Sequence, residues 1–176
     1  IGNCTALVMI ELVGNRLKRL PESLGNLRNL ETLELRANQL EYLPQSIGKL
    51  QKLKKLTLQR NRLKELPESF GDLRIGTVWL NENELETLPE SFSNLRVYDV
   101  HLYYNNIKVF PFEALVPRNK LTYFRVGLKN NPLDLNTIPP IVRQYCSSWE
   151  VGAVSFGRDK DSILHICNHK LDRTAF

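Results

Sequence analysis

Two groups of residues in this sequence have side chains that could do chemistry. In the first, His101 follows the carboxylate of Asp99 by two residues, so on a β-strand both side chains would share a face. A general base needs a nucleophile within hydrogen-bond reach, and no serine or cysteine is expected on that face. We therefore interpret His101 as a contact residue, and we predict no enzyme activity, small-molecule substrate or cofactor.

The second group is His165, Cys167 and His169, which alternate and would share one face of a strand, with Cys146 as a possible fourth ligand. Zinc binds such side chains tetrahedrally, but the C-x-x-C spacing that is usual for a structural zinc site is absent. Strands often hold such residues in a core or at a sheet edge. We expect no metal site here.

The elements that must position these residues are copies of one segment. LETLELRANQLEYLP, from Leu30 to Pro44, reappears 23 residues later as LKKLTLQRNRLKELP, from Leu53 to Pro67. Both fit the pattern L-x-x-L-x-L-x-x-N-x-L. An asparagine marks each of six copies, at Asn15, Asn38, Asn61, Asn83, Asn105 and Asn131. Within each copy, x-L-x-L-x alternates with a period of two, which predicts a short strand with its leucines on one face.

This pattern resembles the leucine-rich repeat family, in the 23-residue form with an L-P-x-S-I-G-x-L segment found in intracellular Ras-group, plant and bacterial members. The resemblance implies an α/β fold, a curved solenoid with a parallel β-sheet on its concave face and turns or short helices on its convex face. It also implies that each asparagine turns inward and hydrogen-bonds main chain of neighbouring coils. A stack of coils buries leucine rows that one coil cannot bury alone.

The repeats divide the chain into an array over residues 1–133 and a non-repeating C-terminal cap over residues 134–176. The alternative for the second segment is the start of a further domain. Ile1 to Cys4 matches the middle of later copies, so we expect the sequence to begin within a repeat of a longer array. Cys4 occupies a position that Leu27 and Leu50 hold in later copies, and we expect its side chain to be buried.

Positions between the leucines should point out from the concave sheet and form columns across neighbouring coils. Trp79, His101, Tyr103 and Tyr104 then form one exposed patch, and aromatic residues and arginine commonly dominate interface energies. We predict a protein-protein interaction module, with an adaptor or recognition role in signalling or host interaction. The predicted partner-binding residues are Arg36, Arg60, Trp79, Asn81, His101, Tyr103 and Tyr104.

Charge supports a protein partner better than nucleic acid. The net charge is +5, and the basic residues near the third copy are Lys49, Lys52, Lys54 and Lys55. Acidic residues follow in the next copy, at Glu65, Glu68 and Asp72. Phosphate binding needs a continuous basic track, and these acidic residues interrupt it. A basic surface that binds nucleic acid is therefore the alternative and not the main prediction. A further alternative is the recognition part of a longer multidomain enzyme or effector.

The number and spacing of the cysteines indicate where in or outside the cell the protein is located. Extracellular members of the family usually close the array with a cysteine-rich module, and the three cysteines here are widely spaced, at Cys4, Cys146 and Cys167. The first residues lack the basic segment of a signal peptide, and no apolar run reaches the roughly 18 residues of a membrane helix. We expect a cytoplasmic protein or, alternatively, a secreted bacterial effector that acts in a host cytosol.

Overall fold

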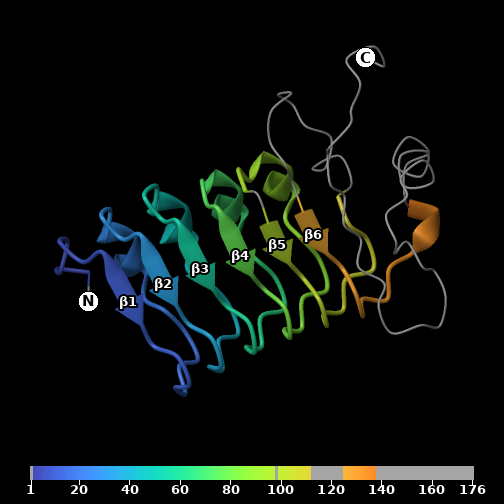
Figure 1. Ribbon diagram of the computed structural model, residues 1–176, viewed down its shortest axis with the longest axis horizontal. Helices are drawn as coiled ribbons and strands as arrows, with labels where there is room; N and C mark the ends of the chain where they lie inside the picture. Colours follow the sequence, from blue (N-terminus) through green and yellow to red (C-terminus); the bar gives the residue numbers. More distant parts are fainter. Residues whose placement is uncertain (1, 98, 112–124, 138–176) are drawn as a thin grey trace, which may run out of the picture.

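The computed structural model describes residues 2–97, 99–111 and 125–137, which stack coil upon coil along one axis (Figure 1). One parallel sheet runs the length of the stack in the order β1-β2-β3-β4-β5-β6. The strands are β1 (Met9–Glu11), β2 (Thr32–Glu34), β3 (Lys55–Thr57), β4 (Thr77–Trp79), β5 (Asp99–His101) and β6 (Arg125–Gly127). The predicted parallel-sheet solenoid is confirmed. Most of the predicted cap lies outside the described residues, and so do the possible metal ligands Cys146, His165, Cys167 and His169.

The spacing of the asparagines sets the register between strands. Residues six positions before successive asparagines are directly paired, so Met9 lies beside Thr32, Thr32 beside Lys55 and Lys55 beside Thr77. Residues four positions before successive asparagines are paired in the same way, so Trp79 lies beside His101 and His101 beside Gly127. Because the strands are parallel and lie in the sheet in sequence order, each position of the repeat forms a column with one residue per coil.

The core consists of the repeated apolar positions. Leu33, Leu56, Val78, Val100 and Val126 occupy the centres of β2 to β6 and are fully buried. In η3 and η4, Phe70 and Phe92 take the place that Leu24 and Ile47 hold in η1 and η2, and Phe110 takes the place that Leu20 and Leu43 hold before the proline. All three rings are buried in the core behind the sheet. Phe92 and Phe110 meet edge to face with ring centroids 6.1 Å apart, a favourable aromatic arrangement.

Short 3-10 helices line the side opposite the sheet: η1 (Glu22–Asn26), η2 (Gln45–Lys49), η3 (Glu68–Asp72) and η4 (Glu90–Asn94), with η6 (Leu135–Thr137) near the end of the described chain. Each of η1 to η4 follows a proline, which presets the backbone for the turn and lacks an N–H to leave unpaired. The predicted short helices on this side are confirmed. Among the described residues, no helix is both long and apolar enough for a membrane span.

The helices of neighbouring coils also bond to one another. The Glu22 carboxylate accepts hydrogen bonds from the main-chain N–H groups of Gln45 and Ser46, each at 2.9 Å. Glu68 accepts one in the same way from Ser91, at 3.1 Å. A glutamate that follows the proline of one coil thus caps the helix of the next coil, an interaction that the sequence analysis did not predict.

The first coil departs from the expectation for Cys4. Its side chain is exposed, whereas Leu27 and Leu50 at the matching positions are buried. Within the described residues this coil has a neighbour on one side only, so its inward positions are covered from one direction. Val8, Met9 and Val13 are also exposed around β1.

Candidate functional site

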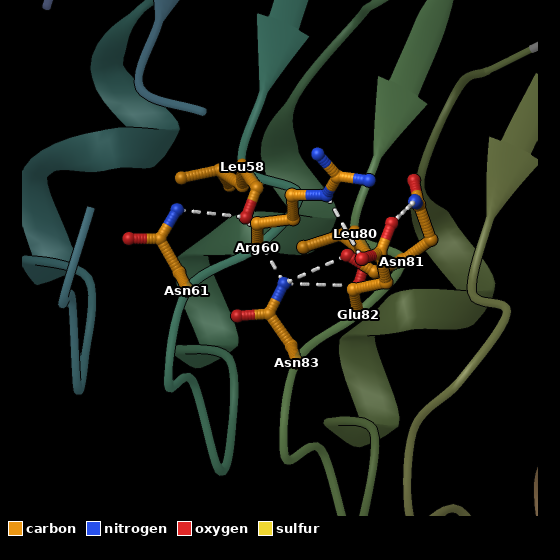
Figure 2. A network of polar contacts seen from close by, with 7 residues as sticks. All are labelled: Leu58, Arg60, Asn61, Leu80, Asn81, Glu82 and Asn83. Atoms are coloured by element: carbon orange, nitrogen blue, oxygen red, sulfur yellow. Dashed lines mark hydrogen bonds and ion pairs between the residues drawn. The ribbon is translucent and has the colours of Figure 1, made fainter. Parts of the chain in front are cut away.

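The asparagines of coils two to six form a continuous ladder of hydrogen bonds. Each side-chain amide donates to the leucine carbonyl three residues earlier in its own coil and to the matching carbonyl of the coil before. The Leu58 carbonyl, for example, accepts from Asn61 at 2.9 Å and from Asn83 at 3.0 Å (Figure 2). The Asn83 oxygen accepts in turn from the Leu63 N–H, at 3.1 Å. The members of this ladder are Asn38, Asn61, Asn83, Asn105 and Asn131.

Asn15 does not join this ladder, which corrects its prediction as a sixth member. Its side chain is exposed and donates to the Val13 carbonyl in its own coil, at 3.3 Å. The Leu12 carbonyl instead accepts from Asn38, at 2.7 Å. The ladder depends on main chain from a preceding coil, and the described residues place no coil before Asn15.

The residue before each asparagine has a left-handed backbone conformation. Its φ lies between 56° and 59° at Ala37, Arg60, Glu82, Tyr104 and Asn130, and φ is 70° at Gly14. This conformation is uncommon for residues other than glycine, and it bends the chain sharply so that the asparagine enters the core. The sequence analysis missed it. Gly14 and Asn130 were the available signal, since glycine and asparagine tolerate this conformation best.

Three of the predicted partner-binding residues form a packed cluster on the exposed face of the sheet. The Trp79 indole stacks on the His101 imidazole, with ring centroids 5.7 Å apart and planes 9° apart. The Tyr103 ring lies 5.5 Å beyond, tilted by 48°, and its hydroxyl is 3.3 Å from His101 Nδ1. All three side chains are partly exposed. We call Trp79, His101 and Tyr103 the aromatic cluster.

Charged residues of the same columns extend the aromatic cluster across the sheet. The Lys55 ammonium lies 5.9 Å from the centroid of the Trp79 ring and forms an ion pair with Glu34 at 2.6 Å. On the other side, an Asp99 carboxylate oxygen lies 3.6 Å from His101 Nε2. Burial, and then the negative charge of Asp99, raise the pKa of the Tyr103 hydroxyl. Lys55 and Glu34 belong to the predicted columns but were not among the predicted site residues.

The other predicted residues lie apart from the aromatic cluster. Arg60 forms an ion pair with Glu82 at 2.9 Å, and Asn81 donates to the second oxygen of Glu82 at 3.3 Å (Figure 2). These three residues form a separate polar group at the bends after β3 and β4. Arg36 is exposed, and within the described part of the chain its side chain has no ion pair. Tyr104 is 56% exposed, beside Tyr103 in sequence but in the left-handed bend.

This arrangement is suited to contact rather than to chemistry. His101 has an orienting carboxylate in Asp99, but the hydroxyl within its reach belongs to Tyr103, whose raised pKa makes it a poor nucleophile at neutral pH. The part of the chain that the structure describes has no group of three or more histidine, cysteine or acidic residues that could hold a metal ion. A flat, partly exposed aromatic surface flanked by charges of both signs is typical of a protein interface.

Comparison with known proteins identifies the fold as that of leucine-rich repeat proteins. Residues 1–73 match a family model described as a leucine-rich repeat region. The crystal structure of PEPR1 with AtPEP1 is similar, with a TM-score of 0.65 and 28% identity over 75% of this chain. So is the leucine-rich repeat ectodomain of the plant membrane receptor kinase GASSHO1/SCHENGEN3 from Arabidopsis thaliana, crystallised with CASPARIAN STRIP INTEGRITY FACTOR 2, with a TM-score of 0.58 and 36% identity over 65% of this chain.

A leucine-rich repeat protein of Leptospira interrogans shares the fold, with a TM-score of 0.50 and 22% identity over 77% of this chain. The present chain spans only 19%, 14% and 46% of these three proteins, in the order given. No curated protein matches the sequence significantly. The first 73 residues thus match a leucine-rich repeat region, and the described part of the chain has the fold of leucine-rich repeat proteins.

Proposed function

We propose that the exposed face of the sheet binds an extended segment of a protein partner, with the aromatic cluster at the centre of the contact. The observation that carries this proposal is the stacking of Trp79 on His101 in the middle of a solvent-facing sheet. An indole held flat in an exposed position presents a large apolar area at little further cost in side-chain entropy. The protein's role is then recognition, without catalysis.

Two similarities support a peptide-like partner. The PEPR1 and GASSHO1/SCHENGEN3 structures were both solved as complexes, with AtPEP1 and with CASPARIAN STRIP INTEGRITY FACTOR 2. Those proteins are much longer than this chain, so the identity of the partner does not carry over. The proposed contact area comprises the aromatic cluster, Lys55 and Asp99, with Arg36, Arg60, Asn81 and Tyr104 at its margin.

The proposal includes an adaptor or recognition role in signalling or host interaction, in the cytoplasm. A secreted bacterial effector that acts in a host cytosol is the alternative location. The proposed role and the two proposed locations rest on the resemblance in the L-P-x-S-I-G-x-L segments and on the number and spacing of the cysteines. Fractionation of the source cells tests the location directly, since a cytoplasmic protein stays with the soluble intracellular fraction, and recovery from the medium would contradict it.

The test of the binding face begins with capture of partners from the source organism by the intact chain. The affinity of the captured partner is then measured for Trp79→Ala and Tyr103→Ala. Each should weaken binding by about 2 kcal/mol or more while the melting temperature changes little, since both side chains are partly exposed. Glu90→Ala, an exposed substitution in η4, is the matched control and should have no effect. Loss of binding with Glu90→Ala alone would place the contact on the opposite face.

A further inference from the structure

A second charged surface runs along the edge of the sheet where the strands begin. Because all strands are parallel, the segments that lead from each 3-10 helix into the next strand lie on one edge, the amino-terminal flank. Its basic residues, all exposed, are Arg28, Lys49, Lys52, Lys54, Arg74 and Arg96. The acidic residues between η1 and the start of β5 on this flank are Glu31 and Asp72. The excess of four positive charges is most of the net charge of +5.

Contacts between coils show which residues of this flank are neighbours. Lys52 Nζ lies 2.8 Å from Asn29 Oδ1, and Lys54 forms an ion pair with Glu31 at 2.7 Å, each across one coil step. Arg74 and Arg96 are paired directly in a parallel β-bridge. Like charges in such a position repel each other. Within the described residues, no carboxylate lies within ion-pair distance of Arg28, Arg74 or Arg96.

Away from this flank, ion pairs between described residues also cross a coil step. Lys55 meets Glu34 and Arg60 meets Glu82. Arg74 and Arg96, like Glu11 and Glu34, are like-charged residues paired across a coil step. The two guanidinium groups remain available to an anion from outside the chain. Guanidinium groups bind carboxylates through two parallel hydrogen bonds, so neighbouring arginines suit a partner with several carboxylates.

Two of the three acidic residues that follow the basic residues in sequence lie outside this surface. Glu65 lies between Asn61 and Pro67, on the edge where the strands end. Glu68 begins η3, and its carboxylate accepts the Ser91 N–H. Of the three acidic residues Glu65, Glu68 and Asp72, Asp72 alone is on the amino-terminal flank. The opposite edge differs, because there basic residues alternate with Glu41, Glu65, Glu84 and Glu86.

We propose that the amino-terminal flank binds an extended acidic segment of a protein partner. From Arg28 to Arg96 the flank crosses three coil steps, about 15 Å at the strand spacing, which is the length of about five extended residues. This length suits a short acidic segment better than a long duplex. This surface is separate from the aromatic cluster and does not rest on the function proposed above.

The test measures binding of a fluorescein-labelled peptide of about six glutamates to the intact chain by fluorescence anisotropy. Arg74→Gln combined with Arg96→Gln should weaken binding by about tenfold. The control combines Arg16→Gln with Arg19→Gln, two exposed arginines on the opposite edge, and makes the same change in net charge. It should alter the affinity less than about twofold, as should Trp79→Ala. Circular dichroism melting curves establish that each variant is folded.

Three outcomes would overturn the proposal. The first is absence of peptide binding at low salt. The second is an equal loss in the flank variant and the control variant, which would mean that net charge alone attracts the peptide. The third is tighter binding to a DNA duplex of arbitrary sequence than to the peptide, lost in the flank variant, which would make the flank a nucleic-acid surface.

Discussion

The Tyr103 ring lies directly over Gly127, the residue that pairs with His101 in the next strand. A β-carbon at position 127 would overlap the ring and hydroxyl of Tyr103. The column that holds Glu34, Thr57, Trp79 and His101 therefore continues with a tyrosine from the neighbouring column, which occupies the space above the glycine. Glycine at this position allows the third ring to pack beside His101.

The first prediction follows from this contact. Gly127→Ala should displace the Tyr103 ring, because a side chain can move more easily than the paired main chain of β5 and β6. We expect partner binding to weaken by about 1–2 kcal/mol, as for partial loss of an interface aromatic residue, while the chain still folds. Isothermal titration with the captured partner measures the change. Thr32→Ala, on the exposed face of β2, is the control, and equal losses in both variants would contradict the proposed role of Tyr103.

The second prediction concerns the asparagine ladder. Asn61→Ala and Asn83→Ala should each destabilise the fold by about 1–3 kcal/mol, because buried main-chain groups lose their partners. Asn15→Ala is a control of the same residue type, with an exposed side chain outside the ladder, and it should cost much less. Chemical denaturation followed by circular dichroism gives the comparison. Similar losses for Asn15 and Asn61 would show that the ladder does not stabilise the array.

The third prediction is a pH dependence from Glu68. Hydrogen bonds from the side chain and main chain of Ser91 lower the pKa of its carboxyl below the ordinary value of about 4.5. A lowered folded-state pKa adds stability that is present above the unfolded value and is lost as the pH falls through the folded value. The stability difference between the wild type and Glu68→Gln should therefore shrink on acidification below about pH 4.5.

Glutamine is a suitable replacement because Gln45 already holds this position in η2. Glu90→Gln in η4 serves as the control, and denaturant midpoints across the acid range report both variants. A difference between wild type and Glu68→Gln that stays constant with pH would show that the carboxylate does not cap the helix containing Ser91.

The fourth prediction concerns the two ends of the array. Residues 5–20 should exchange their amide hydrogens early, because Val8, Met9 and Val13 around β1 are exposed. Both β1 and β6 are end strands of the described sheet, so the difference in burial sets the order. Val126 to Leu128 are buried and should exchange later. Hydrogen exchange followed by mass spectrometry resolves the two segments. Faster exchange at β6 than at β1 would contradict this order.

The fifth prediction tests the proposed division of the chain at residue 133. If residues 134–176 form a cap, a chain that ends at Leu133 should expose the last leucine row and aggregate, because terminal repeats of a solenoid need a polar outer cover. Size-exclusion chromatography compares it with the full chain. A soluble 1–133 chain that unfolds cooperatively would show that the second segment is appended and does not act as a cap.

The sequence by itself determined the repeat, the order of the strands and their register. The spacing of Asn38, Asn61 and Asn83 is enough, because a parallel stack of equal coils brings matching positions side by side. The same spacing also places Trp79 beside His101. The alternation of leucines likewise identified the buried positions, since a strand has only two faces.

The tertiary structure alone decided what each residue meets in the neighbouring coil. Asn15 and Asn61 occupy the same place in the pattern, yet only Asn61 finds main chain of a preceding coil. Glu68 looks like an ordinary surface charge until η4 is packed beside η3. Arg74 and Arg96 are 22 residues apart in sequence and become partners only in the stack. A repeat pattern encodes the environment within one coil, whereas hydrogen bonds, capping and charge contacts depend on which residues the adjacent coil presents.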